Sequence, residues 1–415
     1  MSAHDAHDQL ARRLGTGDAV VIGLGSMIGA GVFAAFAPAA EAAGTWLLVG
    51  LVLAGLVAYC NATSSARLAA RYPESGGTYV YGQRRLGEGW GYLAGWAFVV
   101  GKTASCAAMA LTVGAYVWPE QARAVAVATV LALTALNLRG VHKSALATRV
   151  IVAVVLVVLA LVVAALWSGG EVELDQLRPD GDVDVHGVLR SAAFLFFAFA
   201  GYARIATLGE EVRDPARTIP RAIPIALAIT LLVYAAIAAG LLVSIGPSAV
   251  AGSDDPLATA VAAGGWSGLE SVVRVGAAVA ALGSLLALIL GVSRTTFAMA
   301  RDGHLPRTLA AVHPRFQVPH HAELAVGLVV TVVVLAADLR GAIGFSSFAV
   351  LAYYAIANAS AQTLPRDAGS RAVPVLGLIG CAALAFALPI DAVLIGAGVL
   401  AVGAGVWLLR RPAAS

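Results

Sequence analysis

Long apolar runs alternate with short polar segments along the whole chain. The clearest run, residues 150–167, has no charged side chain. Several others exceed the ~18–20 residues that a helix needs to cross about 30 Å of hydrocarbon. The last two runs are short and meet at Pro389, which suggests a tight helical hairpin. The pattern predicts twelve membrane spans, at residues 17–40, 44–66, 88–117, 121–139, 147–168, 187–208, 218–245, 270–298, 322–338, 342–364, 372–388 and 390–409.

Composition supports this interpretation and excludes a soluble enzyme or binding domain. Hydrophobic residues make up 60% of the chain and charged residues 12%, whereas an average soluble domain has about 25% charged residues. The predicted fold class is therefore an all-α polytopic membrane protein embedded in a lipid bilayer. The three cysteines lie in apolar runs without metal-ligand spacing. We expect no cofactor, no metal and no nucleic-acid partner.

Basic residues indicate the orientation of the predicted spans. With a cytoplasmic N-terminus, 20 of the 27 Lys and Arg residues fall in inside loops, while the acidic 169–186 loop falls outside. This asymmetry predicts that both termini are cytoplasmic. Residues 1–16 lack the apolar core of a cleaved signal peptide and are expected to form a cytoplasmic segment. We expect a multi-pass protein of the cytoplasmic (inner) membrane.

The first span contains the glycine-rich stretch GLGSMIGAG, residues 23–31. Followed by Glu41, it resembles a dinucleotide-binding turn, but that interpretation needs a water-exposed βαβ domain that the chain does not have. Gly25 and Gly29 also form a G-x-x-x-G pattern, which often allows two membrane helices to pack closely. A third interpretation is an interruption of the helix in mid-membrane.

A second interrupted stretch favours the third interpretation. Span 6 contains FFAFAGYARIA, residues 196–206, and spans 1 and 6 each begin a set of five. Breaks at corresponding positions in two halves are typical of inverted-repeat transporters with a binding site near the bilayer midplane. The N-terminus of a half-helix presents free N–H groups and a positive dipole end to an anion.

Four motifs identify a family resemblance that covers residues from about 15 to 365. They are GSMIGAGVF (25–33), YPESGGTYVY (72–81) followed by GYLAGW (91–96), GEEVRDPARTIPRAI (209–223) and GVSRTTFAMARDGHLP (291–306). In this order they resemble the amino acid–polyamine–organocation permeases. Within the second motif, Gly76 and Gly77 are expected to adopt unusual backbone angles at a turn.

The resemblance implies a leucine-transporter-like fold and a transport activity. The fold is a five-plus-five inverted repeat followed by two further helices. Here the repeats would be residues 17–168 and 187–364, and the final pair 372–409. Family members move amino acids or related amines, driven by proton or sodium gradients or by exchange.

The resemblance also implies a substrate site at the two breaks. The α-carboxylate would meet the backbone of Gly29, Ala30 and Gly31, although Ala30 lacks the hydroxyl that many members carry there. The α-amino group would meet carbonyls near Met27 and Ile28 and in span 6. The span 6 residues expected at the site are Phe197, Ala200, Gly201 and Tyr202.

Two cations lie where few charged residues are expected. Lys102 is near the middle of span 3, and Arg204 lies just beyond the second break, from which it could instead pair with Glu210 or Glu211. Charged residues at membrane depth usually face a cavity and are functional. Some proton-coupled relatives carry an amine on span 5, where this chain has the apolar Val155. Lys102 is therefore a candidate proton-coupling group or a counter-charge for the substrate.

The resemblance, taken with these residues, implies a secondary transporter that moves neutral or acidic amino acids by alternating access, coupled to protons or sodium and acting as a monomer or homodimer. We do not expect an enzyme. The absence of Asp and Glu at mid-depth in spans 1, 3, 6, 8 and 10 argues against a strongly cationic substrate. Two alternatives remain open: an exporter or exchanger with the same fold, and a nutrient sensor that binds without transporting.

Overall fold

The computed structural model describes most of the chain, and its regular structure there is helical. One isolated bridge between Leu14 and Val212 is the only strand-like pairing among these residues. Arg204, Glu210 and Glu211 lie outside the described residues, so the prediction for Arg204 has no structural counterpart here. The described residues are 14–72, 76–140, 145–169, 174–178, 183–202, 205, 212–365 and 370–410.

Every predicted span corresponds to helix in the described part of the chain. Ten segments are long and apolar enough to cross a membrane, and α14 and α16 are shorter apolar helices. The predicted all-α polytopic fold is confirmed. In the order of the predicted spans the helices are α1 (Thr16–Met27) with α2 (Gly31–Ala34) and α3 (Phe36–Ala43), α4 (Leu47–Arg71), α6 (Glu88–Val117), α7 (Ala122–Leu138), α8 (Ala145–Ser168), α9 (Val185–Phe199) with η4 (Ala200–Tyr202), α11 (Pro215–Gly252), α13 (Ser267–Arg301), α14 (His320–Ala336), α15 (Leu339–Gln362), α16 (Ala372–Ala387) and α17 (Ile390–Arg410).

Large apolar side chains on the outside of the helices fit a lipid environment. In a soluble protein such exposed surface would favour aggregation, whereas hydrocarbon solvates it without cost. The chain is therefore described as a multi-pass membrane protein. Examples with more than half of their surface exposed are Leu56, Val157, Leu232, Leu328 and Phe386.

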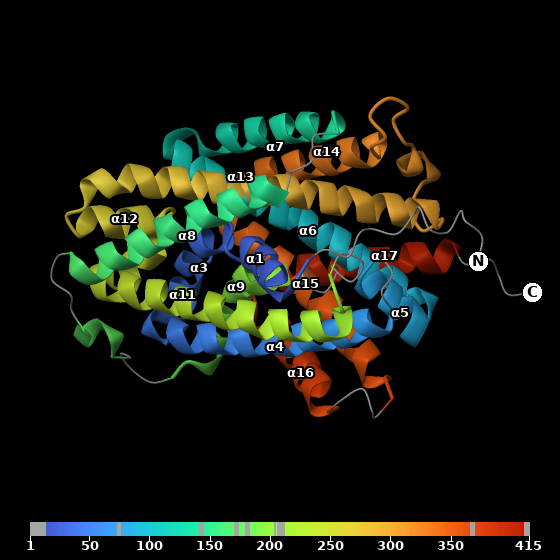
Figure 1. The fold of residues 1–415 in the computed structure, drawn as a ribbon, viewed down its shortest axis with the longest axis horizontal. Helices are drawn as coiled ribbons and strands as arrows, with labels where there is room; N and C mark the ends of the chain where they lie inside the picture. Colours follow the sequence, from blue (N-terminus) through green and yellow to red (C-terminus); the bar gives the residue numbers. More distant parts are fainter. Residues whose placement is uncertain are drawn as a thin grey trace, which may run out of the picture.

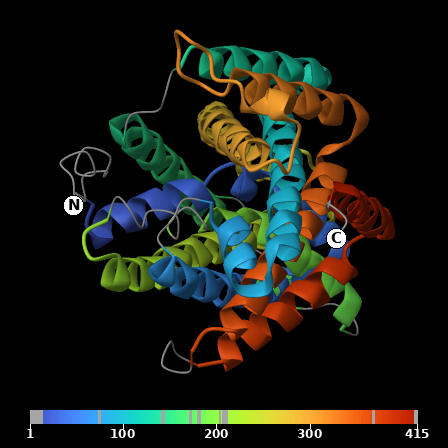
Figure 2. The same cartoon turned by 90° about the vertical axis from the view of Figure 1, so that its right-hand side faces the viewer.

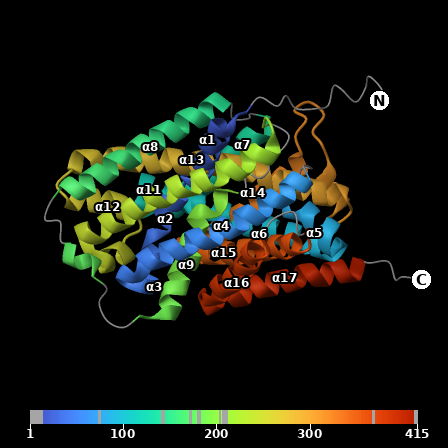
Figure 3. The same cartoon turned by 60° about the horizontal axis from the view of Figure 1, so that its bottom comes forward.

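The helices that flank the two breaks pack together at the centre of the molecule. α1 packs on α11, α3 lies against α9 and α11, and α4 packs on α9 and α11 (Figures 1 and 3). We call α1–α4, α9, η4 and α11 the central bundle. At its edge, the Arg213 N–H donates to the Leu14 carbonyl at 2.9 Å, which ties the start of α11 to the start of α1.

The remaining long helices surround this bundle. α6 packs on α13 and α15, while α7, α13 and α14 form a layer on one side (Figures 1 and 2). Two short helices mark opposite ends of the molecule: α5 (Thr78–Leu86) at one end and α12 (Pro256–Ala263) at the other. We refer to these as the α5 end and the α12 end.

Neither short helix was among the predicted elements, but the predicted turn before α5 is confirmed. Gly76 and Gly77 have φ angles of 130° and 57°, and Gly87 beyond the helix has 106°. These angles lie in the region that glycine enters without a steric penalty. The four remaining short turns of helix are η1 (Gly44–Trp46), η2 (Pro119–Gln121), η3 (Leu174–Leu177) and η5 (Arg307–Ala310).

A polar and aromatic cluster holds α5 to the end of α13. The Tyr79 hydroxyl donates to Asp302 at 2.6 Å and lies 2.8 Å from Nδ1 of His304. The other ring nitrogen of His304 lies 3.5 Å from Glu88, and the ring packs edge-on against Tyr79 and Tyr92. Burial and the Asp302 carboxylate raise the pKa of Tyr79. The phenol therefore stays protonated and remains a donor.

The expected hairpin of the last two helices is only half correct. Their connection is tight, since only Leu388 and Pro389 separate α16 from α17. The two helices pack mainly on α15 rather than on each other, and α16 also contacts α4 and α9 (Figure 3). The extended Leu388 explains the difference, because its ψ of 161° turns the chain away before α17 begins.

Candidate functional site

The first predicted break is present at Ile28–Ala30. α1 ends at Met27, and Ile28 has φ −81° and ψ 70°. The Gly29 N–H then donates to the Met27 carbonyl at 2.9 Å, which together with these angles makes an inverse γ-turn. Helix resumes at Gly31 and continues through the helical Ala35 into α3.

The break leaves a row of backbone donors without partners. Within the described part of the chain, the N–H groups of Ala30, Gly31 and Val32 donate to no backbone or side-chain acceptor. They are the first amides of a helix, where the macrodipole adds partial positive charge. This is the arrangement predicted to receive an anionic group. The Gly29 N–H is not available, because it is used in the γ-turn.

The second break begins at Ala200. α9 ends at Phe199, and the Ala200 N–H is shared between the carbonyls of Phe196 and Phe197. A 3₁₀ turn, Ala200–Tyr202, follows. The Phe197 carbonyl, expected to face the substrate amine, already accepts one hydrogen bond. Residues 203–204 and 206–211 lie outside the described residues, so only the α9 side of this break can be examined.

Glycines bring the two breaks into backbone contact. A Cβ atom on Gly31 would lie 2.6 Å from Cα of Ala198, and one on Gly201 would lie 2.7 Å from the Met27 nitrogen and closer still to the Ser26 carbonyl oxygen. Real Cβ atoms essentially never approach so closely. Both interpretations of the glycines are therefore correct: they allow the helices to pack closely, and they flank an interrupted helix.

The G-x-x-x-G pair packs against neighbouring helices. A Cβ on Gly25 would collide with Val152 of α8, and one on Gly29 would collide with the Ser284 hydroxyl of α13. Ser284 therefore places a polar group directly beside the first break.

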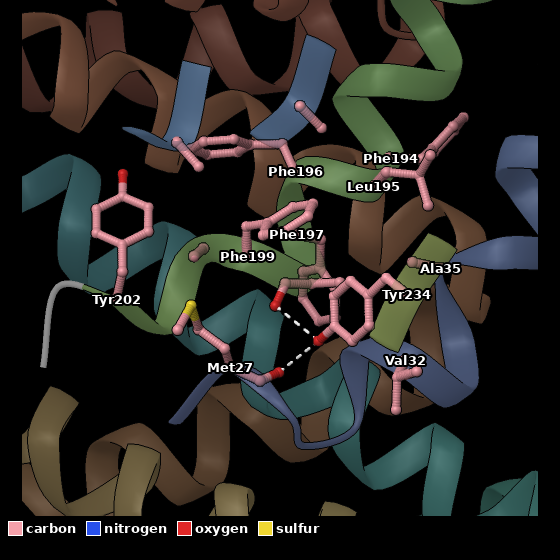
Figure 4. Packing of buried hydrophobic residues seen from close by; sticks show 14 of the residues in the cluster. Met27, Val32, Ala35, Phe194, Leu195, Phe196, Phe197, Phe199, Tyr202 and Tyr234 are labelled. Carbon is pink, nitrogen blue, oxygen red and sulfur yellow. Dashed lines mark hydrogen bonds between the residues drawn. The ribbon is translucent and has the colours of Figure 1, made fainter. Parts of the chain in front are cut away.

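Tyr234 of α11 links the two breaks. Its hydroxyl lies 2.7 Å from the Met27 carbonyl oxygen and 3.2 Å from that of Ala198 (Figure 4). A hydroxyl carries one proton, so it donates to one of these carbonyls at a time. The Met27 carbonyl, expected to bind the substrate amine, therefore already has two neighbouring donors, Tyr234 and the Gly29 N–H.

The aromatic residues of span 6 lie in the buried core around the breaks. Phe197 is 8% exposed and packs in the same cluster as Met27 and Ile28 (Figure 4). Tyr202 is fully buried, and its ring centroid lies 5.1 Å from that of Tyr354 on α15. The structure thus brings Met27–Gly31, Phe197, Ala200, Gly201 and Tyr202 into one region.

Lys102 lies on α6 outside this immediate cluster. Lys102 keeps some exposed surface although it lies deep in the protein beside Cys106, and among the described residues it makes no ion pair with a carboxylate. Met109, two helical turns further along α6, packs against the small cluster that contains Ala30. Lys102 is therefore roughly 10 Å along α6 from the level of the first break, toward the α5 end.

A cavity of about 550 Å³ opens at the α12 end and is lined in part by Ser253, Asp254, Asp255 and Arg274. Arg274 pairs with Asp255 at 2.6 Å and with Glu270 at 3.0 Å.

Two hydrogen bonds through Tyr116 link Arg274, which lines this cavity, to α2 just beyond the first break. Arg274 donates to the Tyr116 carbonyl at 3.4 Å, and the Tyr116 hydroxyl donates to the Phe33 carbonyl of α2 at 3.1 Å.

Among the described residues no cluster of His, Cys, Asp and Glu could hold a metal ion.

Three site residues were missed from the sequence: Tyr234, Ser284 and Tyr116. Each is a single polar side chain in an apolar run without a distinguishing motif. The helical periodicity of the sequence would identify them only if the helices that contact the breaks were already known. Sequence reasoning located the breaks because glycine clusters are visible without that knowledge.

Comparisons with known proteins support a transport role. A sequence model of the amino acid permease family matches residues 18–365. The chain is 66% identical over 413 residues to a Mycobacterium tuberculosis protein named uncharacterized transporter Rv1999c, covering 99% of this chain and 94% of that one. It is 30% identical to the methylthioribose transporter of Bacillus subtilis (85% and 79% covered). It is 27% identical to the branched-chain amino acid permease BcaP of Bacillus subtilis (78% and 74% covered).

Proposed function

The chain belongs to the amino acid permease family, and on that premise we propose that it carries amino acids across the cytoplasmic membrane by alternating access. The observation that carries this proposal is the row of unpartnered amides at Ala30, Gly31 and Val32, next to a second broken helix. A carboxylate accepts such hydrogen bonds strongly because it is charged.

In this proposal the substrate lies between the two breaks. Its α-carboxylate accepts from the Ala30, Gly31 and Val32 amides and from the Ser284 hydroxyl. Its α-amino group donates to carbonyls at Ile28 and in the Ala200–Tyr202 turn. Phe197 contacts the side chain. The hydroxyl of Ser284 replaces the hydroxyl that the family commonly supplies from the position of Ala30.

Access to this site requires helix motion. At the breaks Met27–Gly31, Phe197, Ala200 and Tyr202 are buried, and among the described site residues there Gly201 alone is partly exposed. The central bundle would rock against the surrounding helices, with the inverted repeats at residues 17–168 and 187–364 providing the symmetry. We propose that the α5 end is cytoplasmic, since the basic loops cluster there. The cavity at the α12 end would then be the external entrance.

We propose that Lys102 couples transport to protons. A partly exposed lysine without a carboxylate partner among the described residues can release its proton as its surroundings change. No described Asp or Glu pairs with it, and this favours a neutral or acidic substrate. The name of the relative BcaP fits a neutral amino acid, and that of the methylthioribose transporter adds a compound to be tested.

Uptake into proteoliposomes tests these proposals together. Radiolabelled leucine, glutamate, arginine and methylthioribose are supplied under an imposed pH or sodium gradient. We expect leucine or glutamate uptake driven by the pH gradient, and binding of the same substrate without a gradient.

Each alternative gives a different result in this assay. Counterflow without gradient-driven uptake would indicate an exchanger, and binding without any flux would indicate a sensor. Lys102→Met should abolish the response to the pH gradient while substrate binding persists. If Lys102→Met keeps full gradient-driven uptake, the coupling role is wrong.

A further inference from the structure

A buried carboxylate lies outside the region of the two breaks. Glu323 is in the first turn of α14 and is 0% exposed. Neither of its carboxylate oxygens has a hydrogen-bond partner among the described residues. The sequence does not single it out, because it falls near the predicted start of span 9, where acidic residues usually meet water.

Asn137 of α7 lies at the same level as Glu323. A Cβ on Gly327 would lie 2.6 Å from the Thr134 hydroxyl, and one on Gly140 would lie 3.3 Å from the Phe316 carbonyl. α7 and α14 therefore run antiparallel. One helical turn beyond the contact between Thr134 and Gly327, residue 137 of α7 lies opposite residue 323 of α14. The Asn137 amide donates to the Leu286 carbonyl at 3.4 Å, while its own oxygen has no partner.

Further unpartnered polar atoms lie on the helices that pack around Glu323. The hydroxyls of Thr134 on α7 and Thr296 on α13 are buried without hydrogen bonds in the described part of the chain, as is Nδ1 of His320. α7, α13 and α14 pack on one another in one layer, which Figure 2 shows from the α5 end. Several orphaned polar atoms within one layer of helices are unusual, because native proteins satisfy nearly all buried polar groups.

The charged groups that face Glu323 are few. Arg294 of α13 is the cation close enough to act on it electrostatically. α7 carries no charged residue between 124 and 138 and is followed by the exposed Arg139, and Lys102 on α6 is not among the groups that act electrostatically on Glu323. η5 adds the exposed Arg307. His320 and His321 precede Glu323 on α14 itself.

An ionised carboxylate in this position would be poorly solvated, since it receives no hydrogen bond. A protonated one needs only an acceptor for its hydrogen, and Asn137, one helical turn from the contact between Thr134 and Gly327, has a side-chain oxygen without a partner among the described residues. The Arg294 charge and the α14 dipole act in the opposite direction, toward the ionised form. Opposing influences of this kind allow a group to bind and release a proton.

We propose that Glu323 is a proton-binding site, with the bound proton donated toward the Asn137 side-chain oxygen and the layer α7–α13–α14 enclosing it. The site is separate from Lys102 and from the substrate. It therefore does not depend on the proposed transport mechanism. Its ligand is the proton, and a sodium ion is the competing occupant.

Infrared spectroscopy of the purified protein near neutral pH tests the assignment. We expect a C=O stretching band of a protonated carboxyl that shifts in D₂O and is lost in Glu323→Gln. The matched control Glu120→Gln removes an exposed glutamate at the α12 end, and it should keep the band. A spectrum unchanged by Glu323→Gln would overturn the proposal, because Glu323 would then be ionised.

Thermal unfolding provides a second readout that needs no transport. Raising the pH from about 5 to about 8 should lower the midpoint of the wild type more than that of Glu323→Gln, since only the wild type can lose this proton. Equal shifts would count against the site. A rise in midpoint on adding sodium chloride rather than choline chloride, absent in Glu323→Gln, would assign the site to sodium and overturn the proton assignment.

Discussion

Gly201→Ala offers the most direct test of how closely the two broken helices must approach. The added methyl would lie 2.7 Å from the Met27 nitrogen, about 0.7 Å short of the 3.4 Å at which ordinary contact begins, and closer still to the Ser26 carbonyl oxygen. Both obstacles are backbone atoms, so no side-chain rotation relieves them. The backbones of the two breaks must separate by roughly 1 Å.

Two energetic effects follow from that separation. Overpacking of a close-packed interior costs about 1–3 kcal/mol, so the midpoint of thermal unfolding should fall. A displacement of about 1 Å in groups that bind a substrate can lower a rate by about 100-fold. We therefore expect a loss of kcat/KM for uptake that is larger than the loss of stability alone would explain.

The matched control is Gly398→Ala on α17, where an added Cβ meets nothing within 4 Å. Replacing a helical glycine by alanine there should raise stability by up to about 1 kcal/mol and leave uptake unchanged. Both variants are compared with wild type by thermal unfolding in detergent and by uptake into proteoliposomes. If Gly201→Ala transports within about twofold of wild type and unfolds at the same midpoint, the inferred contact between the breaks does not matter.

Three further predictions concern single polar groups. Tyr234→Phe keeps the ring but leaves the carbonyls of the breaks without their hydroxyl donor, which should lower the unfolding free energy by about 1–2 kcal/mol; the exposed Tyr59→Phe should change it by less than about 0.5 kcal/mol, and equal losses would contradict this role. Asp255→Asn removes one of the two carboxylates that pair with Arg274 at the α12-end cavity. A cysteine reporter in the cavity lining, Ala249→Cys, should then be alkylated roughly fivefold faster; an unchanged alkylation rate would show that the ion pair does not restrict access to the cavity. Tyr79→Phe should lower stability by about 1–2 kcal/mol, and because the pKa of this phenol is raised, the loss should stay constant from about pH 7 to about pH 9; a loss that shrinks with pH would indicate ionisation.

Much of the fold could be predicted because the bilayer restricts the options of the chain. An apolar run that must satisfy its own backbone in hydrocarbon has to be helical, so span 88–117 and α6 have the same bounds. The break at Ile28–Ala30 was predictable for a related reason, since clustered glycines weaken a helix locally. The observed break lies one residue before the predicted one at residues 29–31, because Gly31 already begins the next helix.

What the sequence concealed depends on contacts between distant segments. α5 has the polar sequence TYVYGQRRL, whose helix is stabilised by the cluster around Tyr79 rather than by an apolar run. Tyr234 has no special neighbours along the chain, and its role follows only from the position of α11 beside both breaks. Glu323 is buried although it lies in the first turn of a helix, because α14 packs against α6, α7 and α13, and no local pattern indicates that packing.

The bridge between Leu14 and Val212 has a practical consequence for following the motion of this protein. Since the Arg213 N–H is bonded to the Leu14 carbonyl at 2.9 Å, the starts of α1 and α11 should travel as one body. Spectroscopic probes on Gly17 and Arg217, both exposed, would then keep a constant separation and act as an internal ruler. A change in the distance from either probe to one on α13 could be assigned to displacement of the central bundle.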